Sequence, residues 1–318
     1  MITPELLHYF SAGLPIMLGC FGSSIGQGIA GLSGQEALTR QVLGSDQSFR
    51  ATIIGIALIE SGTIVALVTA LLTLFNTPEV LNMDVAIAEL GASLAVGISA
   101  AAVSIAASFV VRATTHSMAR QPFFSQKLFP FMLISQSIIE APVIFGFIIS
   151  MLIRNQLNVD VDFYKSMALL AAGLVIAIGC LGPSIGQALF AHTACKSLGV
   201  NKNAYPQIFP FSLINQALIE TPMIFCMLLS LIICFMTIPH VAPLLVSTRC
   251  LVAAITMGVS TLGVGIGIGY ISSRGCLNIA EDPAMYSSTI RATLLAAAFT
   301  ESMVIYAFVV SILLLVRA

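Results

Sequence analysis

The feature that most constrains this chain is a fourfold repeat of a long apolar stretch with one glutamate near its middle. The four acids are separated by 80, 80 and 81 residues and are Glu60, Glu140, Glu220 and Glu301. The residues around each acid are also alike, as in segments 57–61 and 217–221. A spacing this regular indicates an internal repeat. We therefore expect four similar units with one carboxyl group in each.

The composition places these units in a membrane. The chain has 318 residues, of which 58% are hydrophobic and 8% charged, whereas roughly a quarter of the residues in a typical soluble domain are charged. The formal net charge of -1 gives no reason to expect nucleic acid as a partner. The first apolar run begins near Ser11 without a preceding Lys or Arg. Because it matches a later repeat, we expect mature structure there rather than a leader.

The seven cysteines are scattered and form no C-x-x-C pair. Cys20, Cys180, Cys226 and Cys234 lie inside apolar runs, where a cysteine commonly serves as a small packing residue. We favour that interpretation over disulfide or metal chemistry.

A transmembrane helix needs roughly 20 apolar residues, and the chain holds eight such runs. They cover residues 10–38, 49–75, 85–114, 126–153, 163–195, 206–236, 243–272 and 286–315. We expect an all-α membrane protein made of four tandem helical hairpins. The expected units are residues 1–80, 81–157, 158–240 and 241–318.

The charged residues predict how the hairpins are oriented. Nine of the thirteen Lys and Arg lie in or beside the loops inside the hairpins, namely Arg40, Arg50, Arg112, Arg120, Lys127, Lys196, Lys202, Arg274 and Arg291. The opposite end carries acids, among them Glu79 and Asp160, with fewer cations, among them Arg317. By the positive-inside rule the loops face the cytoplasm and both termini face outward, in a membrane that we expect to be a bacterial plasma membrane. Every unit then enters in the same direction, unlike the units of inverted-repeat transporters.

The two helices of each unit differ in residue size. Small residues recur four apart in the first helix, for example at Gly22 and Gly26 and at Gly182 and Gly186. This spacing lets helix backbones approach closely in lipid, so we expect the first helices to form an inner layer. The second helices are bulkier and should form an outer layer. Two prolines, Pro142 and Pro222, follow their acids by two residues and should weaken the helix there.

A carboxylate at mid-membrane is costly unless it is protonated or paired with a cation. No Lys or Arg lies near the middle of any expected span. Four such acids at a constant interval therefore predict groups that load and release an ion, with the neutralising cation on another chain. The alternatives are acids that only hydrogen-bond neighbouring helices, a stand-alone secondary cation transporter, and a passive ring or pore.

Several motifs resemble the c subunit, or proteolipid, of rotary ATP synthases, over nearly the whole chain. The inner-helix pattern Gly-x-x-x-Gly-Gln occurs at residues 22–27 and 182–187, and residues 120–122 match the Arg-Gln-Pro turn of the family. The outer-helix segment Thr300-Glu301-Ser302 with Tyr306 is similar as well. The loops of units three and four depart from the turn pattern.

The resemblance implies a homo-oligomeric ring that turns against a stator a subunit bearing an arginine, with membrane lipid around it. Ion flow would drive rotation, and central stalk subunits would contact the cytoplasmic loops near Arg40, Arg120, Lys202 and Arg274. An F-type rotor is favoured because every hairpin keeps its acid, and a V/A-type proteolipid with the same role is the alternative. The chain has no nucleotide loop of the Walker kind. We therefore expect no catalytic residues and no cofactor in it.

The transported ion is expected to be a proton, with sodium as the alternative. Sodium requires several oxygen ligands, which the resemblance implies are an inner-helix Gln and a Ser or Thr after the acid. Units one and three have both, so sodium could bind at Glu60, Gln27 and Ser61 and at Glu220, Gln187 and Thr221. Unit two has Ala107 and Ala141 instead, and unit four has Ser302 but Ile268. Gln136 and Gln216 could add an oxygen or only bond between helices.

Overall fold

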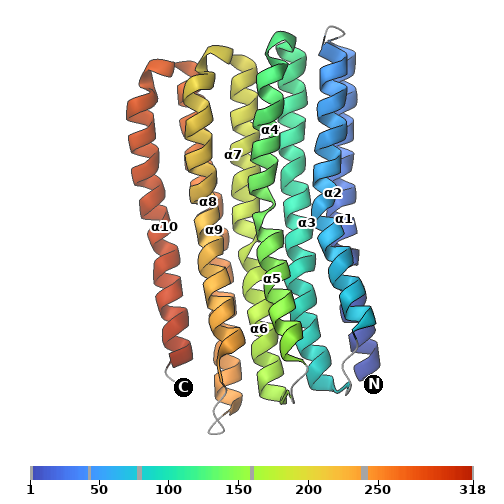
Figure 1. Ribbon diagram of the computed structural model, residues 1–318. Helices are drawn as coiled ribbons and strands as arrows, with labels where there is room; N and C mark the ends of the chain where they lie inside the picture. Colours follow the sequence, from blue (N-terminus) through green and yellow to red (C-terminus); the bar gives the residue numbers. More distant parts are fainter. Residues whose placement is uncertain (1–2, 42–43, 77–80, 158–160, 238–242, 317–318) are drawn as a thin grey trace.

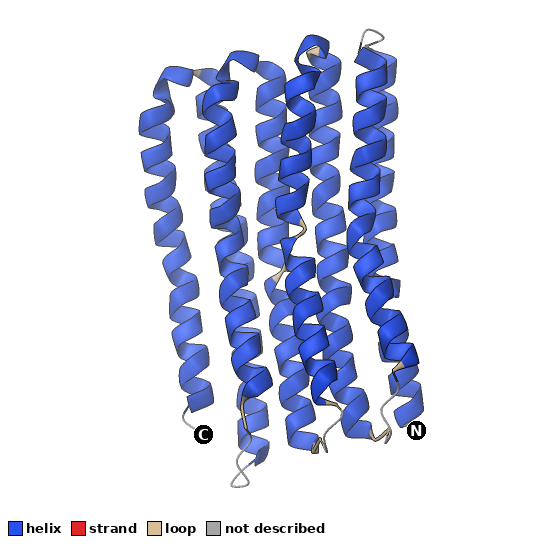
Figure 2. Ribbon diagram, viewed as in Figure 1, coloured by secondary structure: helices blue, strands red, loops and turns tan. Residues whose placement is uncertain are grey.

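The computed structural model describes residues 3–41, 44–76, 81–157, 161–237 and 243–316, and these ranges are almost entirely helical, with no β-strand (Figures 1 and 2). The acids Glu79 and Asp160 and the cation Arg317, used above for orientation, lie outside the described residues. Eight helical segments are long and apolar enough to cross a membrane. The prediction of eight spans in four hairpins is therefore confirmed.

The first helices of the hairpins are α1 (Pro4–Arg40), α3 (Met83–Arg120), α6 (Phe163–Gly179) continued by α7 (Leu181–Val200), and α9 (Pro243–Glu281). The second helices are α2 (Ser45–Phe75), α4 (Ser125–Ile139) continued by α5 (Ala141–Gln156), α8 (Tyr205–Phe235) and α10 (Tyr286–Val316). The turns inside the hairpins lie at one end of the bundle, and both ends of the chain lie at the other (Figure 1). We call these the loop end and the terminal end.

The helices form the two expected layers. Helices α1, α3, α6–α7 and α9 pack against one another in succession and form the inner layer. The first three outer helices each lie against their own inner helix and the next one, so α2 contacts α1 and α3, and α8 contacts α6, α7 and α9, whereas α10 lies against α9 and α8. Burial follows this arrangement, since 67% of the apolar segment of α3 is buried but only 33% of that of α2. The outer helices therefore present most of the surface that faces lipid.

Glycines make the close approach of the inner helices possible. A methyl group on Gly186 of α7 would overlap the backbone carbonyl of Gly265 in α9, and one on Gly22 of α1 would overlap the backbone of Ala101 in α3. Because lipid offers no hydrophobic driving force between helices, such van der Waals contact has to supply the attraction. The small-residue pattern of the sequence thus marks the inner layer correctly.

The helix interruptions agree only partly with the proline positions. The regular helix stops at Ile139 and resumes at Ala141, so Glu140 lies at the break expected before Pro142. Helix α8 instead continues through the buried Pro222, and the expectation was wrong there. A second break, between α6 and α7 at Cys180, precedes Pro183 and was not anticipated. A proline ring clashes with the carbonyl four residues earlier, but the surrounding packing decides whether the helix opens.

Polar side chains from neighbouring hairpins cover the exposed helix ends. Arg154 of α5 donates to Thr73 Oγ1 at 2.8 Å and to the carbonyl of Leu72 at the end of α2. At the loop end Gln121 donates to the Gly199 carbonyl and Asn201 to the Ala280 carbonyl, both at 2.9 Å. Asn201 therefore makes the contact of Gln121 in a hairpin whose turn departs from Arg-Gln-Pro. The bonds of Gln121 and Asn201 satisfy carbonyls in the last turns of α7 and α9, and Arg154 adds a second donor to the Leu72 carbonyl, which also accepts from the N–H of Asn76.

The packing of α2 on α3 predicts a difference between two substitutions on one helix. A side chain at Gly55 would run into Val111 of α3, so Gly55→Leu should lower the free energy of unfolding by about 1–3 kcal/mol. Ala57 is exposed on the same helix, and Ala57→Leu should change it by less than about 0.5 kcal/mol. Unfolding of the full chain in mixed micelles measures both. Equal losses would contradict the α2–α3 contact.

Candidate functional site

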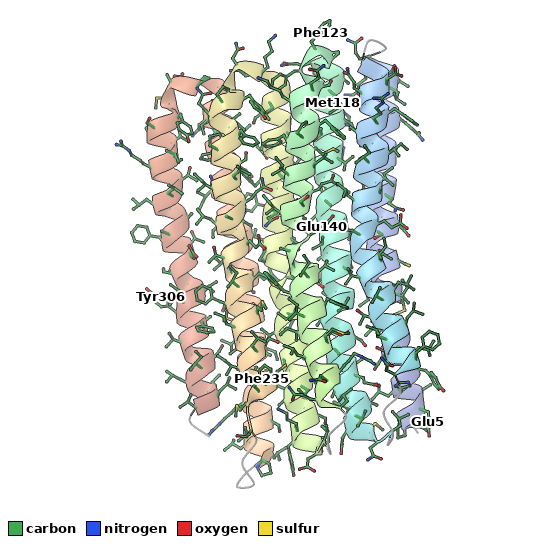
Figure 3. The ribbon with its side chains drawn as sticks, in the orientation of Figure 1. Glu5, Met118, Phe123, Glu140, Phe235 and Tyr306 are labelled. Carbon is green, nitrogen blue, oxygen red and sulfur yellow. The ribbon has the colours of Figure 1, made fainter. Side chains whose placement is uncertain are left out.

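The four glutamates of the repeat lie near the middle of the outer helices, and Figure 3 shows Glu140 at mid-height in the bundle. Their depth is fixed by contacts with the inner helices. Ile59, which precedes Glu60, meets Gly26 of α1, and Ile219, which precedes Glu220, meets Gly186 of α7. These glycines directly precede Gln27 and Gln187. The structure therefore brings each of these glutamines to the depth of the acid in its own hairpin.

The burial of the four acids depends on the hairpin that precedes each of them. Glu140, Glu220 and Glu301 are half-buried, whereas Glu60 is exposed. The carboxyl of Glu140 interacts with the hydroxyl of Ser61, which lies on α2 of the preceding hairpin. Glu60 lies on α2, and no described residue of another outer helix covers it on the side away from α4. The outer helix of the preceding hairpin thus contributes a hydroxyl beside Glu140.

This arrangement separates the acid from the hydroxyl that follows it in sequence. The hydroxyl beside Glu140 is that of Ser61. If the repeat keeps this register, Ala141 corresponds to Ser61 for Glu220 and Thr221 corresponds to it for Glu301. Ser302, which follows Glu301, donates to the Phe299 carbonyl of its own helix at 2.7 Å.

The two inner-helix glutamines differ in their surroundings. Gln187 is 1% exposed, and neither polar atom of its amide has a hydrogen-bond partner among the described residues. Gln27 is half-buried at the edge of the chain. A buried amide without partners is unusual in folded proteins. Gln187 therefore has free donor and acceptor capacity at the depth of Glu220.

Two further glutamines lie one turn before their acids and bridge the outer helices. Gln136 donates to the Gly55 carbonyl at 3.2 Å, and Gln216 donates to Ser135 Oγ at 3.3 Å. Both bonds reach the preceding hairpin. Their carbonyl oxygens are buried and have no partner among the described residues. The amide nitrogens thus donate hydrogen bonds to the neighbouring outer helix, and the amide oxygens remain able to accept one.

A hydroxyl cluster that the sequence did not reveal supports the turn before Glu60. Ser104 of α3 donates to the Ile59 carbonyl at 3.0 Å, and Ser23 of α1 donates to Ser104 at 3.0 Å. Thr63 of α2 contacts Ser23 and donates to the Gly19 carbonyl at 3.1 Å. The sequence shows serines at positions 23 and 104, but nothing in it indicates that the two side chains meet. Three helices are thereby joined at the depth of the first acid.

The terminal end holds a second buried acid. Glu89 of α3 lies 2.6 Å from Nδ1 of His8 in α1, and both side chains are 1% exposed. The pair joins the first two inner helices and lies far along the bundle from the mid-membrane acids. No cluster of three or more His, Cys, Asp or Glu that could hold a metal occurs among the described residues. The seven cysteines are free thiols, and all but Cys20 are buried, in agreement with a packing role.

Comparison with known proteins gives one consistent result. A family model described as the C subunit of ATP synthase matches residues 10–73, 90–153, 170–233 and 251–314. The chain is similar to the ATP synthase c subunit of Geotalea uraniireducens, with 41% identity over 68 residues, or 21% of this chain and 75% of the relative. The protein of that name from Trichlorobacter lovleyi is 40% identical over 80 residues, or 25% and 85%. The one from Synechococcus sp. is 38% identical over 73 residues, or 23% and 89%. Each relative thus corresponds to about one hairpin.

The hydroxyl cluster predicts unequal effects for two buried serines of α3. Ser104→Ala removes the donor to the Ile59 carbonyl and should lower the free energy of unfolding by about 0.6–1.5 kcal/mol. Ser108 donates only to Ile105 of its own helix, at 2.6 Å, so Ser108→Ala should lower it by less than about 0.5 kcal/mol. Reversible unfolding of the full chain in mixed micelles compares them. A Ser104 effect no larger than that of Ser108 would exclude the cluster as a support of the site.

Proposed function

This chain belongs to the ATP synthase c-subunit family, and we propose that it is a rotor subunit whose four outer-helix glutamates carry the ions of a rotary ATP synthase. The observation that supports this most is the geometry of the acids. Glu140, Glu220 and Glu301 are held half-buried between neighbouring outer helices, and the repeat gives each the same depth. In lipid such a carboxyl has to be protonated or cation-bound. It can therefore carry an ion as a neutral pair past the hydrocarbon.

Release of the ion needs a positive charge that this chain does not provide at that depth. Arg154 and Lys165 lie toward the terminal end, where they bind carbonyls at the ends of α2 and α8. An arginine on a separate stator subunit would supply the charge. As each acid passes that arginine, the ion would leave on one side and another would enter from the other side. This sequence of events would couple ion flow to rotation, with ATP chemistry on other subunits.

The outward faces of α1 and α9, which we call the two edges of the chain, support assembly into a ring. A methyl group on Gly28 of α1 or on Gly263 of α9 would meet no atom within 4 Å. The corresponding positions in the interior of the chain are tightly packed, since Gly269 lies against Gly186 and Gly182 lies against Leu262. The edges therefore have the surface of an inner-layer interface without a neighbour. A second copy packed α9 to α1 would fill both edges and would cover Glu60.

We propose the orientation that the charges favour, with the loop end in the cytoplasm and the terminal end outside, in a bacterial plasma membrane. Arg40, Arg120, Lys202 and Arg274 lie at or near the loop end. A central stalk would contact this end. Cross-hairpin bonds such as that of Asn201 keep the turns of neighbouring hairpins together there, which supports a common docking surface.

Protons are the ion that the site arrangement favours. If the hydroxyl comes from the preceding hairpin, Glu140 has Ser61 but Ala107, Glu220 has Gln187 but Ala141, and Glu301 has Thr221 but Ile268. None of these three sites combines both extra oxygen ligands. Only Glu60, with Gln27 and the Ser302 of another copy, would have the full set. Sodium needs several oxygens, whereas every one of the four carboxyls can bind a proton.

The function predicts that each repeat acid is essential for coupling. Single Glu→Gln substitutions at the four positions should each lower ATP-driven ion pumping by the assembled complex at least about tenfold, because one blocked site stops rotation past the stator. Glu5→Gln, which removes an exposed acid at the terminal end, serves as the matched control and should leave pumping within about twofold. Pumping by reconstituted complexes and carbodiimide modification of the four acids are the measurements. Normal pumping by a Glu220→Gln complex would rule out the proposal.

The proton assignment predicts how sodium affects carbodiimide modification at constant pH. Added Na⁺ should not slow the reaction at Glu140, Glu220 or Glu301, since their sites lack one oxygen ligand. Mass spectrometry of the separate peptides gives the four rates. Slower modification of all four acids in sodium would instead identify a sodium rotor, and the rotor function itself would stand.

A further inference from the structure

The inner layer contains a groove that the ion sites do not use. It is lined only by α3 and α7 and has a volume of about 710 Å³. No residue of an outer helix lines it, so it opens on the side of the inner layer that faces away from the carboxyls. In a ring this side is the central opening. The groove is therefore separate from the path of the ion.

One end of the groove is apolar and the other is basic. The apolar part is formed by residues such as Ala102, Ile105, Ile185 and Leu189. Toward the loop end the lining continues with Arg112, Arg120 and Lys196, which are all exposed. We call these three residues the basic cluster. A groove that is apolar along its length and basic at one end has the character of a binding site for an anionic amphiphile.

The dimensions of the groove match one leaflet of a membrane. Its inner end, at Ala102, lies close in sequence to Ser104, which bonds to Ile59 at the depth of the first acid. From Ala102 to Arg112 the helix rises about 15 Å, which is half of the roughly 30 Å hydrocarbon core. The basic cluster then begins where the headgroups begin. An acyl chain can thus lie along the apolar part while its phosphate meets the cations.

Neighbouring side chains leave the positive charge of the cluster largely available. His116 accepts from Arg40 at 3.3 Å and lies 3.3 Å from Glu36, so that acid is engaged by α1 and His116 at the edge of the groove. Glu36 also lies 3.8 Å from Arg40. His192 donates through Nδ1 to the Phe109 carbonyl at 3.1 Å. The histidines are held in place within the lining, and the three long cations face it.

The basic cluster is specific to the two central hairpins. At the positions that correspond to Arg112, His116 and Arg120, the first hairpin has Leu32, Glu36 and Arg40. The third hairpin has His192, Lys196 and Val200, and the fourth has Ser273, Leu277 and Glu281. The repeat therefore gathers three cations only where α3 meets α7, whereas the first hairpin has Glu36 with Arg40 and the fourth has Glu281 as its one charged residue at these positions. Packing between helices does not require this difference, since the other inner-helix pairs form without it.

We infer that the groove between α3 and α7 binds a phospholipid with an anionic headgroup, once per chain, in the leaflet at the loop end. The apolar lining holds an acyl chain, and Arg112, Arg120 and Lys196 bind the phosphate. The inference rests on this groove and not on which ion the acids carry. A lipid held there fills the inner side of the layer and neutralises cations that would otherwise repel one another.

A tryptophan in the groove allows a direct test, because the chain has no tryptophan of its own. Phe109 lines the groove, so Phe109→Trp places a fluorophore there. The assembled protein is reconstituted in phosphatidylcholine vesicles with a minor fraction of dibrominated phosphatidylglycerol or, separately, dibrominated phosphatidylcholine. We expect at least about threefold stronger quenching by the anionic lipid. Tyr270→Trp, at an exposed position of α9, should show nearly equal quenching by the two lipids.

Two charge variants in the Phe109→Trp background show which cations produce the preference for the anionic lipid. Arg112→Gln, Arg120→Gln and Lys196→Gln together should abolish the preference for the anionic lipid. Arg50→Gln, Lys127→Gln and Arg291→Gln remove the same charge from exposed positions on the outer helices near the loop end and should leave the preference intact. If the first variant does not assemble, Lys196→Gln alone should weaken the preference, and Ala102→Phe should reduce quenching by both lipids.

Three results would overturn the inference. They are equal quenching by the two lipids at position 109, loss of the preference with the outer-helix variant, and retention of it with the basic-cluster variant. If the last occurs together with loss of coupled ATP hydrolysis, the cluster serves a protein partner at the loop end. Because the readout is lipid contact rather than ion movement, failure here leaves the proposed rotor function untouched.

Discussion

The close approach of the inner helices is the constraint on which the rest of the structure depends. In lipid, helices cannot be held together by burial of apolar surface alone, because the lipid is as apolar as the side chains. Contacts such as Gly186 on Gly265 bring backbones into van der Waals range. The first three outer helices then each pack between two neighbouring inner helices, and α10 packs on α9. The depth of every acid follows from that placement.

The contacts between hairpins repeat with one register. Six side-chain contacts join positions that are 81 residues apart. Four link the first hairpin to the second, His8–Glu89, Ser23–Ser104, Gly55–Gln136 and Thr73–Arg154, and two link the second to the third, Thr114–Cys195 and Ser135–Gln216. They run from the terminal end past the acids toward the loop end. A slip of one hairpin against another would break the contacts at that interface together. The register therefore keeps the acids level.

The repeat is regular in its backbone but not in its side chains. The hydroxyl cluster occurs between the first two hairpins, and the basic cluster lies between the second and third. Gln187 is deeply buried, while Ala107 and Ile268 occupy the same position elsewhere. Fusion of the hairpins into one chain allows such differences, because each position can change independently. All four hairpins nevertheless keep the acid.

The sequence by itself determined the membrane location, the eight spans, the two layers and the position of the acids. The length of an apolar run and the spacing of its small residues are local properties, so they can be read from one segment without knowing which helices pack against it. Only the tertiary structure decided that the helix opens before Pro142 and Pro183 but not at Pro222, because packing around each proline settles its effect. It also decided that Ser61 meets Glu140 rather than completing the site of its own hairpin. Sequence adjacency could not show this, because the partner of an outer-helix side chain lies on the next helix in space.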